Sequence, residues 1–143
     1  RILSLKTAPL FEVACELGVR SPKKDHLINM VKPYGFNSGM AFQITDDACD
    51  LWKAQGRKWA DLANGRVPVS LKSLQLKLSS QEVVTASDYS NTLQMADKYI
   101  VAAEKAAEQF PPSEVKSLLH QLPRSYCMAL LQEVGAVGQI NAS

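Results

Sequence analysis

Apolar residues recur along this chain at intervals of three and four, the period of an α-helix, and strand-like alternation is weak. The pattern therefore predicts an all-α protein. The expected helices span residues 3–17, 25–53, 71–78, 88–109 and 113–134. Short connections between helices favour antiparallel neighbours in a helical bundle.

Proline and glycine modify the first two predicted helices. Pro9 predicts either a kink or a first helix that begins near residue 9, and Gly18 is expected to end that helix. In the second helix a break or bend is expected at Pro33 and Gly35, followed by a firm helix over residues 37–52. The predicted apolar face of the first helix consists of Leu10, Val13, Ala14 and Leu17.

The boundaries of the last two helices follow from capping residues. Ser87 with Asp88 is the expected N-terminal cap of the helix over residues 88–109. Ser113 is expected to cap the final helix, and Pro123 is expected to interrupt it.

Length and composition are those of an ordinary globular protein. The chain has 143 residues, enough for one domain with a core, and 46% of them are apolar and 21% charged. A net charge of +2 without a long basic run gives no case for binding nucleic acid. Because the chain opens on Arg1 inside a helical pattern, we expect residues 1–143 to be a single all-α domain or a fragment of one.

The cysteines and the hydropathy indicate a compartment. Cys15, Cys49 and Cys127 are scattered and odd in number, which argues against a disulfide framework or a zinc knuckle and suits a reducing environment. No apolar run approaches the ~20 residues that span a bilayer. We therefore expect a cytoplasmic protein without a transmembrane segment. An organelle location stays open because the chain does not begin with methionine.

Three aspartates interrupt an otherwise apolar stretch, "GMAFQITDDACDLW" at residues 39–52. On a helix, Asp46 and Asp50 lie one turn apart on one face, and Asp47 lies about 100° round the axis. Gln43 extends the same polar stripe. Like charges at this spacing repel each other unless a positive group lies between them.

The aspartate cluster has two interpretations. Acidic pairs on helices are most often solvated surface. Alternatively, the cluster binds Mg²⁺, which takes one or two carboxylates and completes its shell with water or phosphate oxygens. The apolar surroundings, Gln43 and the basic loop that follows bring a metal–diphosphate complex level with the solvated surface, and the residues alone leave both interpretations open. The bases that would neutralise its remaining oxygens are Lys6, Arg57, Lys58 and Arg66.

Three segments in this order resemble the trans-polyprenyl (isoprenoid) diphosphate synthases. They are "KTAPLFEVACELG" at residues 6–18, "YGFNSGMAFQITDDACD" at 34–50 and "DLANGR" at 61–66. The matching motifs are an opening Lys-Thr-Ala, the block G-x-A-F-Q-I-x-D-D-x-x-D, and D-L-x-x-G-[KR]. The resemblance implies an isoprenoid-synthase helical bundle, of which this chain is the C-terminal half.

This family condenses isopentenyl diphosphate with an allylic diphosphate and depends on Mg²⁺. The resemblance therefore implies a prenyltransferase in which metal and bases stabilise the departing pyrophosphate. Asp46, Asp47 and Asp50 look like the second aspartate-rich motif and would be the metal ligands, with Asp46 and Asp50 facing the metal. The implied catalytic residues are Asp46, Asp47 and Lys6. The implied substrate-binding residues are Lys6, Thr7, Phe42 (against the hydrocarbon), Gln43, Arg57, Lys58 and Arg66.

The sequence also departs from the family pattern. It contains neither the first aspartate-rich motif nor the arginines that bind isopentenyl diphosphate, so the chain by itself is expected to hold half a site. The basic segment after the second motif reads "GRKWAD", and the register between Arg57 and Lys58 stays open. "GRVPVSL" lacks the threonine usual before the proline.

These departures leave three functional interpretations. The first is a divergent prenyl diphosphate synthase. The second is an inactive regulatory or structural subunit of a heteromeric synthase. The third is a class I terpene cyclase, which shares the fold and the ionisation chemistry. Because members of the family commonly dimerise through helices, we expect a homo- or hetero-oligomer.

Overall fold

The computed structural model describes residues 7–20, 27–58 and 82–136, and in these ranges the regular elements are α-helices. They are α1 (Ala8–Val19), α2 (Ile28–Ala54), α5 (Ala86–Glu108) and α6 (Glu114–Glu133). The prediction of an all-α protein is confirmed. The predicted helix over residues 71–78 and the predicted site residues Lys6 and Arg66 lie outside the described ranges.

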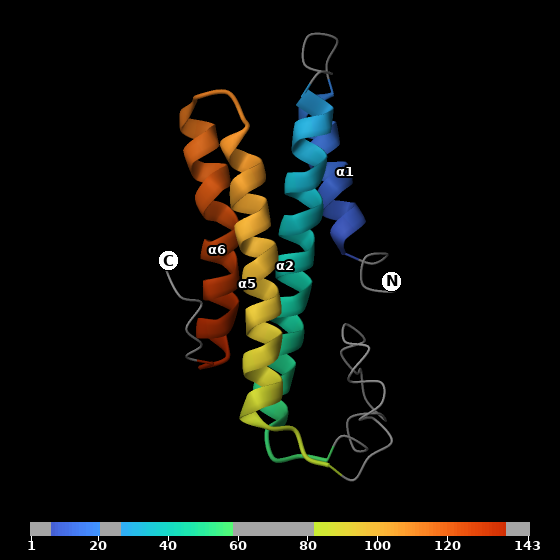
Figure 1. Ribbon diagram of the computed structural model, residues 1–143, viewed down its shortest axis with the longest axis vertical. Coiled ribbons are helices and arrows are strands. Elements are labelled where there is room, and N and C mark those ends of the chain that lie inside the picture. Colours follow the sequence, from blue (N-terminus) through green and yellow to red (C-terminus); the bar gives the residue numbers. More distant parts are fainter. Residues whose placement is uncertain (1–6, 21–26, 59–81, 137–143) are drawn as a thin grey trace.

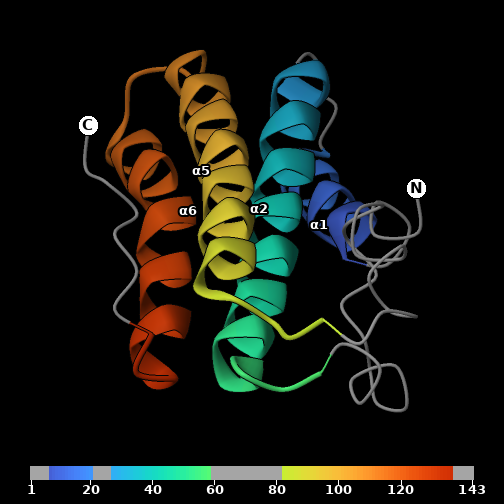
Figure 2. The same ribbon diagram turned by 60° about the horizontal axis from the view of Figure 1, so that its bottom comes forward.

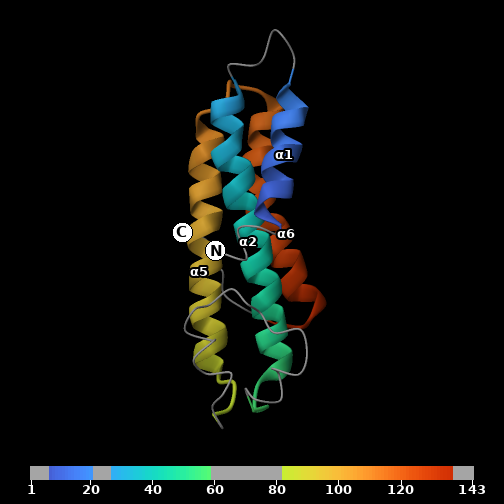
Figure 3. The same cartoon turned by 90° about the vertical axis from the view of Figure 1, so that its right-hand side faces the viewer.

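The helices run nearly along the long axis of a bundle, with α2 in contact with each of the others (Figures 1 and 3). Figure 2 shows α6, α5, α2 and α1 side by side in that order. Helices α2 and α5 are antiparallel, because Tyr34 contacts Phe110 after the end of α5 and Trp52 contacts Tyr89 near its start. Helices α5 and α6, whose connection is short, also pack as antiparallel neighbours, as predicted.

Helix α1 begins beside its proline. Ala8 is the first helical residue and Pro9 occupies the first turn, where its missing N–H removes no intrahelical hydrogen bond. This confirms the expectation that the helix begins near residue 9. The prediction that Gly18 ends the helix is wrong. The helix continues to Val19 and leaves through Arg20 in an extended conformation, which needs no left-handed glycine.

The predicted apolar face of α1 does not face the core in the described structure. Leu10, Val13 and Leu17 are 69%, 50% and 62% exposed, and Ala14 is exposed as well. The opposite side of the helix, with the fully buried Ala8, packs against α2. The periodicity therefore located an apolar stripe, but this stripe is not the face of α1 that packs against α2.

Helix α2 continues through the position where a break was predicted. It is 27 residues long and includes Pro33 and Gly35. Pro33 is exposed, so water can solvate the carbonyl that its missing N–H leaves free, and the Asn37 side chain donates to the Pro33 carbonyl at 2.7 Å. Packing on both sides then keeps the chain helical.

Helix α5 begins two residues before its predicted start. Thr85, not Ser87, is the N-cap: its hydroxyl accepts from the Asp88 N–H, and the Asp88 carboxylate accepts from the Thr85 N–H. This is a capping box, in which two backbone donors are satisfied reciprocally. Ser87 lies in the first turn.

Helix α6 confirms one prediction and corrects another. Ser113 caps it, accepting from the Lys116 N–H at 3.1 Å. The helix is not interrupted at Pro123, which is buried. A proline leaves the carbonyl four residues earlier without its helical donor. Here that carbonyl belongs to Leu119 and accepts from the Tyr34 hydroxyl of α2 at 2.9 Å.

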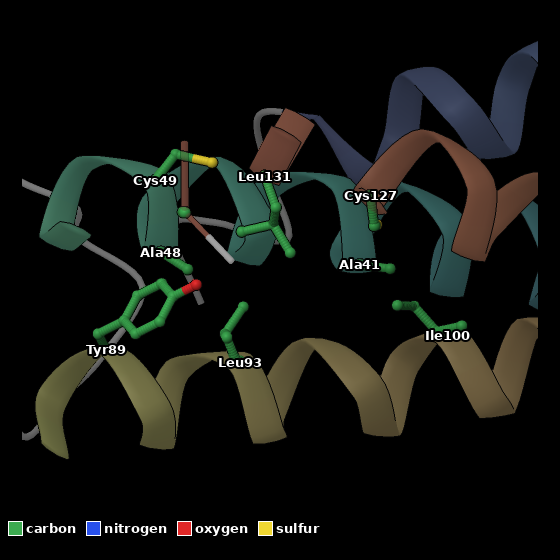
Figure 4. Packing of buried hydrophobic residues seen from close by; sticks show 9 residues of the cluster. Ala41, Ala48, Cys49, Tyr89, Leu93, Ile100, Cys127 and Leu131 are labelled. Carbon is green, nitrogen blue, oxygen red and sulfur yellow. The ribbon is translucent and has the colours of Figure 1, made fainter. Parts of the chain in front are cut away.

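The largest core cluster among the described residues lies between α2, α5 and α6 (Figure 4). Ile100 and Leu131 are essentially inaccessible to solvent, and alanines of α2 allow α5 to approach closely. A smaller cluster joins α1 to the bundle through Ala8, Met40 and Ile44. None of the described helices is long and apolar enough to cross a membrane.

Candidate functional site

Two of the predicted motifs meet where α1 begins. The Thr7 hydroxyl donates to Oε1 of Gln43 at 2.6 Å, a contact between residues 36 positions apart. Nε2 of Gln43 in turn donates to Oδ1 of Asp47 at 3.4 Å. A hydrogen-bonded chain therefore runs from the start of α1 to the aspartate cluster of α2.

Glycines on α2 bring the backbone of α1 close enough for this contact. A Cβ atom on Gly39 would lie 2.7 Å from the Cα of Ala8, the residue after Thr7. A Cβ atom on Gly35, one turn away, would lie 2.8 Å from the Cα of Glu12. Such distances are shorter than side-chain carbons adopt, so only glycine fits at both positions without moving α1.

The three aspartates of α2 occupy different environments. Asp47 is 4% exposed, whereas Asp46 and Asp50 are exposed. Partial burial, and secondarily the negative charge of Asp46, raise the pKa of Asp50, and Lys53 opposes the shift. Gln43 therefore joins the buried carboxylate, while the two carboxylates predicted to face a metal are those that solvent reaches.

The fit of this cluster to a magnesium ion is partial. Among the described residues, no three carboxylates, imidazoles or thiols are grouped so as to hold one metal ion. The pair Asp46 and Asp50 nevertheless has the hard oxygen donors that Mg²⁺ prefers, one turn apart on the exposed side of α2. Burial is the main cause of the raised pKa of Asp50, and a cation between the two carboxylates would relieve the smaller contribution from the charge of Asp46.

Phe42 lies in an aromatic cluster that joins three helices. Its ring centroid is 5.8 Å from that of Phe11 on α1 and 5.7 Å from that of Tyr126 on α6. Phe42 precedes Asp46 by one turn, so both lie on the same side of α2. These contacts give the ring a packing role, and its predicted contact with the substrate hydrocarbon stays a prediction.

The predicted bases Arg57 and Lys58 follow α2 directly. Both are exposed. The Val84 N–H donates to the Arg57 carbonyl at 2.9 Å, and Lys58 forms an isolated antiparallel bridge with Val83. This short pairing ties the segment after α2 to the start of α5, and places the two bases at the end of the helix that carries the aspartates.

Tyr126 is a residue of this region that the sequence did not indicate. Besides packing on Phe42, its hydroxyl donates to the Ser38 carbonyl of α2. Burial raises the pKa of Tyr126, so the hydroxyl remains a donor at neutral pH. Since 88 residues separate it from Ser38, no local spacing could have revealed the contact.

In this all-α bundle the start of α1 at Thr7 meets the glutamine–aspartate stripe of α2, and the sequence motifs follow the order found in an isoprenoid synthase. The family model for polyprenyl synthetase matches residues 1–102. The chain therefore belongs to the polyprenyl synthetase family, a family of prenyltransferases that act on diphosphates. The match includes α1 and α2 but not α6. A comparison with curated proteins and one with solved structures found no match.

Proposed function

We propose that this protein takes part in Mg²⁺-dependent condensation of isopentenyl diphosphate with an allylic diphosphate. The observation that carries the proposal is the 2.6 Å hydrogen bond between Thr7 and Gln43. It joins the two family motifs implied to contact the allylic diphosphate, next to the implied metal ligands.

In this proposal Gln43 binds a diphosphate oxygen through the amide proton that Asp47 does not accept. Thr7, whose single hydroxyl proton is donated to Gln43, lies beside the diphosphate and orients that amide. The N-terminus of α1 lies at the same place, and its partial positive charge favours an anion there. Asp46 and Asp50 are the proposed ligands of Mg²⁺, which when bound would supply positive charge for the departing pyrophosphate.

Asp47 has a different role from its neighbours in this proposal. Buried and hydrogen-bonded to Gln43, it fixes the orientation of that amide. Exposed Arg57 and Lys58, together with Lys6 and Arg66 from the sequence, provide the proposed charges for the remaining diphosphate oxygens.

A binding experiment tests the proposal first. Isothermal titration calorimetry with dimethylallyl diphosphate, with and without MgCl₂, should show binding that is at least about tenfold tighter with the metal, as expected when a cation bridges carboxylates and phosphates. Asp46→Asn should remove most of the metal dependence. The matched control is Glu108→Gln at the exposed end of α5, which should not change it. Equal affinity with and without Mg²⁺ would contradict the proposal.

Product analysis with labelled isopentenyl diphosphate then identifies the reaction. Incorporation of label into a longer prenyl diphosphate is the expected result. Products formed from the allylic diphosphate alone would indicate a terpene cyclase. Turnover that requires a second polypeptide would indicate a subunit of a heteromeric synthase. Native mass spectrometry would detect that polypeptide bound to the chain and would show whether the protein forms the predicted homo- or hetero-oligomer.

A further inference from the structure

We infer that Gly39 is a positioning residue, which holds the Thr7 hydroxyl within hydrogen-bonding reach of Gln43 by admitting the backbone of α1 against α2. The consequence for ligand binding rests on the proposed function. The positioning itself is argued from the contacts of α1 and α2 alone.

The space around Gly39 is closed by backbone, not by flexible side chains. Its Cβ atom would lie 2.7 Å from the Cα and 3.3 Å from the amide nitrogen of Ala8, and 3.1 Å from the Cβ of Phe11. Neither Ala8 nor the root of Phe11 can rotate away, so a methyl group at position 39 must displace the start of α1.

This displacement would act directly on the hydrogen bond. On one side Thr7 is covalently adjacent to Ala8, and on the other Gln43 follows Gly39 by one helical turn. The Thr7–Gln43 distance is 2.6 Å, and a separation beyond about 3.5 Å no longer constitutes a hydrogen bond. A shift of about one ångström at the start of α1 therefore breaks it.

The largest core cluster of the described residues lies away from this contact. The largest core cluster is made by α2, α5, α6 and the residues that follow them, and contains no residue of α1. Helix α1 packs chiefly on α2. The start of α1 can thus move while this cluster keeps its packing, and the displacement would be felt in the smaller cluster of Ala8, Met40, Ile44 and Ala96.

A spectroscopic experiment on the full chain tests the inference. The side-chain amide signals of Gln43 are assigned by two-dimensional ¹H–¹⁵N NMR, using Gln43→Glu to identify them. Thr7→Val, which removes the hydroxyl while keeping the shape, gives the signal position without the hydrogen bond. Gly39→Ala is expected to move the Gln43 signals toward the Thr7→Val position.

Two further variants complete the design. Gly18→Ala is the matched control, because it adds the same methyl group to a glycine of α1 with nothing within 4 Å, and it should leave the Gln43 signals in place. Ala8→Val enlarges the same contact from the α1 side. It should reproduce the Gly39→Ala shift, and it carries the test if Gly39→Ala does not fold.

The functional consequence is measured with inorganic pyrophosphate and Mg²⁺ as the probe. Gly39→Ala should weaken binding about three- to tenfold, the range expected for one lost hydrogen bond. Adding Thr7→Val to Gly39→Ala should cause no further loss, because both changes remove the same interaction. Gly18→Ala should bind as the unmodified chain does.

The outcomes separate the two proposals. Gln43 signals that stay in place in a folded Gly39→Ala or Ala8→Val variant overturn the positioning role. Signals that move, in a chain that binds no Mg²⁺–pyrophosphate in any form, support the positioning role and overturn the proposed diphosphate site. Fully additive losses from Thr7→Val and Gly39→Ala overturn the inference that Gly39 acts through Thr7.

Discussion

Helix α2 contacts α1 and α6 by opposite means. Toward α1 it presents Gly35 and Gly39, so that the two backbones nearly touch. Toward α6 it uses side chains that reach across to backbone carbonyls, as Tyr34 does to Leu119 and Cys49 to Leu130. The α1 contact therefore fails when atoms are added, and the α6 contact fails when atoms are removed.

The difference matters for the site, because its polar residues lie at the close contact. Thr7 can donate to Gln43 only while the backbone of α1 stays near α2. The α6 contact, by contrast, bears on the site through packing, as in the contact of Tyr126 with Phe42. Four substitutions test this comparison, from the largest expected effect to the smallest.

Leu131→Ala should be the most damaging change. Leu131 is 1% exposed and lies at the centre of the cluster formed by α2, α5 and α6. Truncating a buried leucine removes apolar contacts and leaves a cavity, which costs about 3 kcal/mol. Urea unfolding followed by circular dichroism measures the loss. Leu118→Ala, at a position 67% exposed on the same helix, is the control and should change stability little.

Gly35→Ala should lower the free energy of unfolding by about 2 kcal/mol, although it adds only one methyl group. The new Cβ would lie 2.8 Å from both the Cα of Glu12 and the Phe11 carbonyl oxygen. The same unfolding experiment applies. With Gly18→Ala, where the methyl meets open space, the greater helix propensity of alanine should instead stabilise the protein by up to about 1 kcal/mol. Equal effects of the two substitutions would show that backbone proximity does not govern the α1 contact.

Tyr34→Phe should lower the free energy of unfolding by about 1 kcal/mol. It removes the hydroxyl that donates to the Leu119 carbonyl in place of the N–H that Pro123 lacks. Burial raises the pKa of Tyr34 to about 12, so the hydroxyl donates throughout the ordinary pH range. Tyr89→Phe is the control. The Tyr89 hydroxyl is buried and has no hydrogen-bond partner in the described part of the chain, so its removal should be neutral or slightly stabilising. A larger loss for Tyr89→Phe would contradict this account of Pro123.

Asp50→Asn should stabilise the metal-free protein slightly, by about 0.3 kcal/mol at neutral pH, because it removes a like-charge pair one turn apart. The pKa of Asp50 is raised in the folded state by burial and by Asp46. A carboxyl with a raised folded pKa lowers stability as the pH rises through that pKa. The advantage of the variant should therefore vanish below about pH 3, where the aspartate is neutral as well. Thermal unfolding at several pH values checks this, and an advantage that persists at low pH would rule out the electrostatic cause.

The sequence by itself determined the helical class, because a period of three to four apolar residues extends over most of the chain. It also placed Asp46 and Asp50 on one side of a helix and identified Ser113 as a cap, since these relations are local. The motifs that indicate the family could be recognised for the same reason. They are short, and they occur in a fixed order between Lys6 and Arg66.

Only the tertiary structure decided which faces are buried and which prolines are tolerated. The exposed stripe of Leu10 and Leu17 could not be distinguished from a core face, because periodicity does not say which side of α1 meets α2. Pro123 lies inside a helix because Tyr34, 89 residues earlier in the chain, donates to the carbonyl that the proline leaves free. Asp47 is buried, whereas Asp46 and Asp50 are exposed, and it accepts from Gln43, which in turn accepts from Thr7 of a distant segment. Contacts between distant segments fix these features, and no local pattern encodes them.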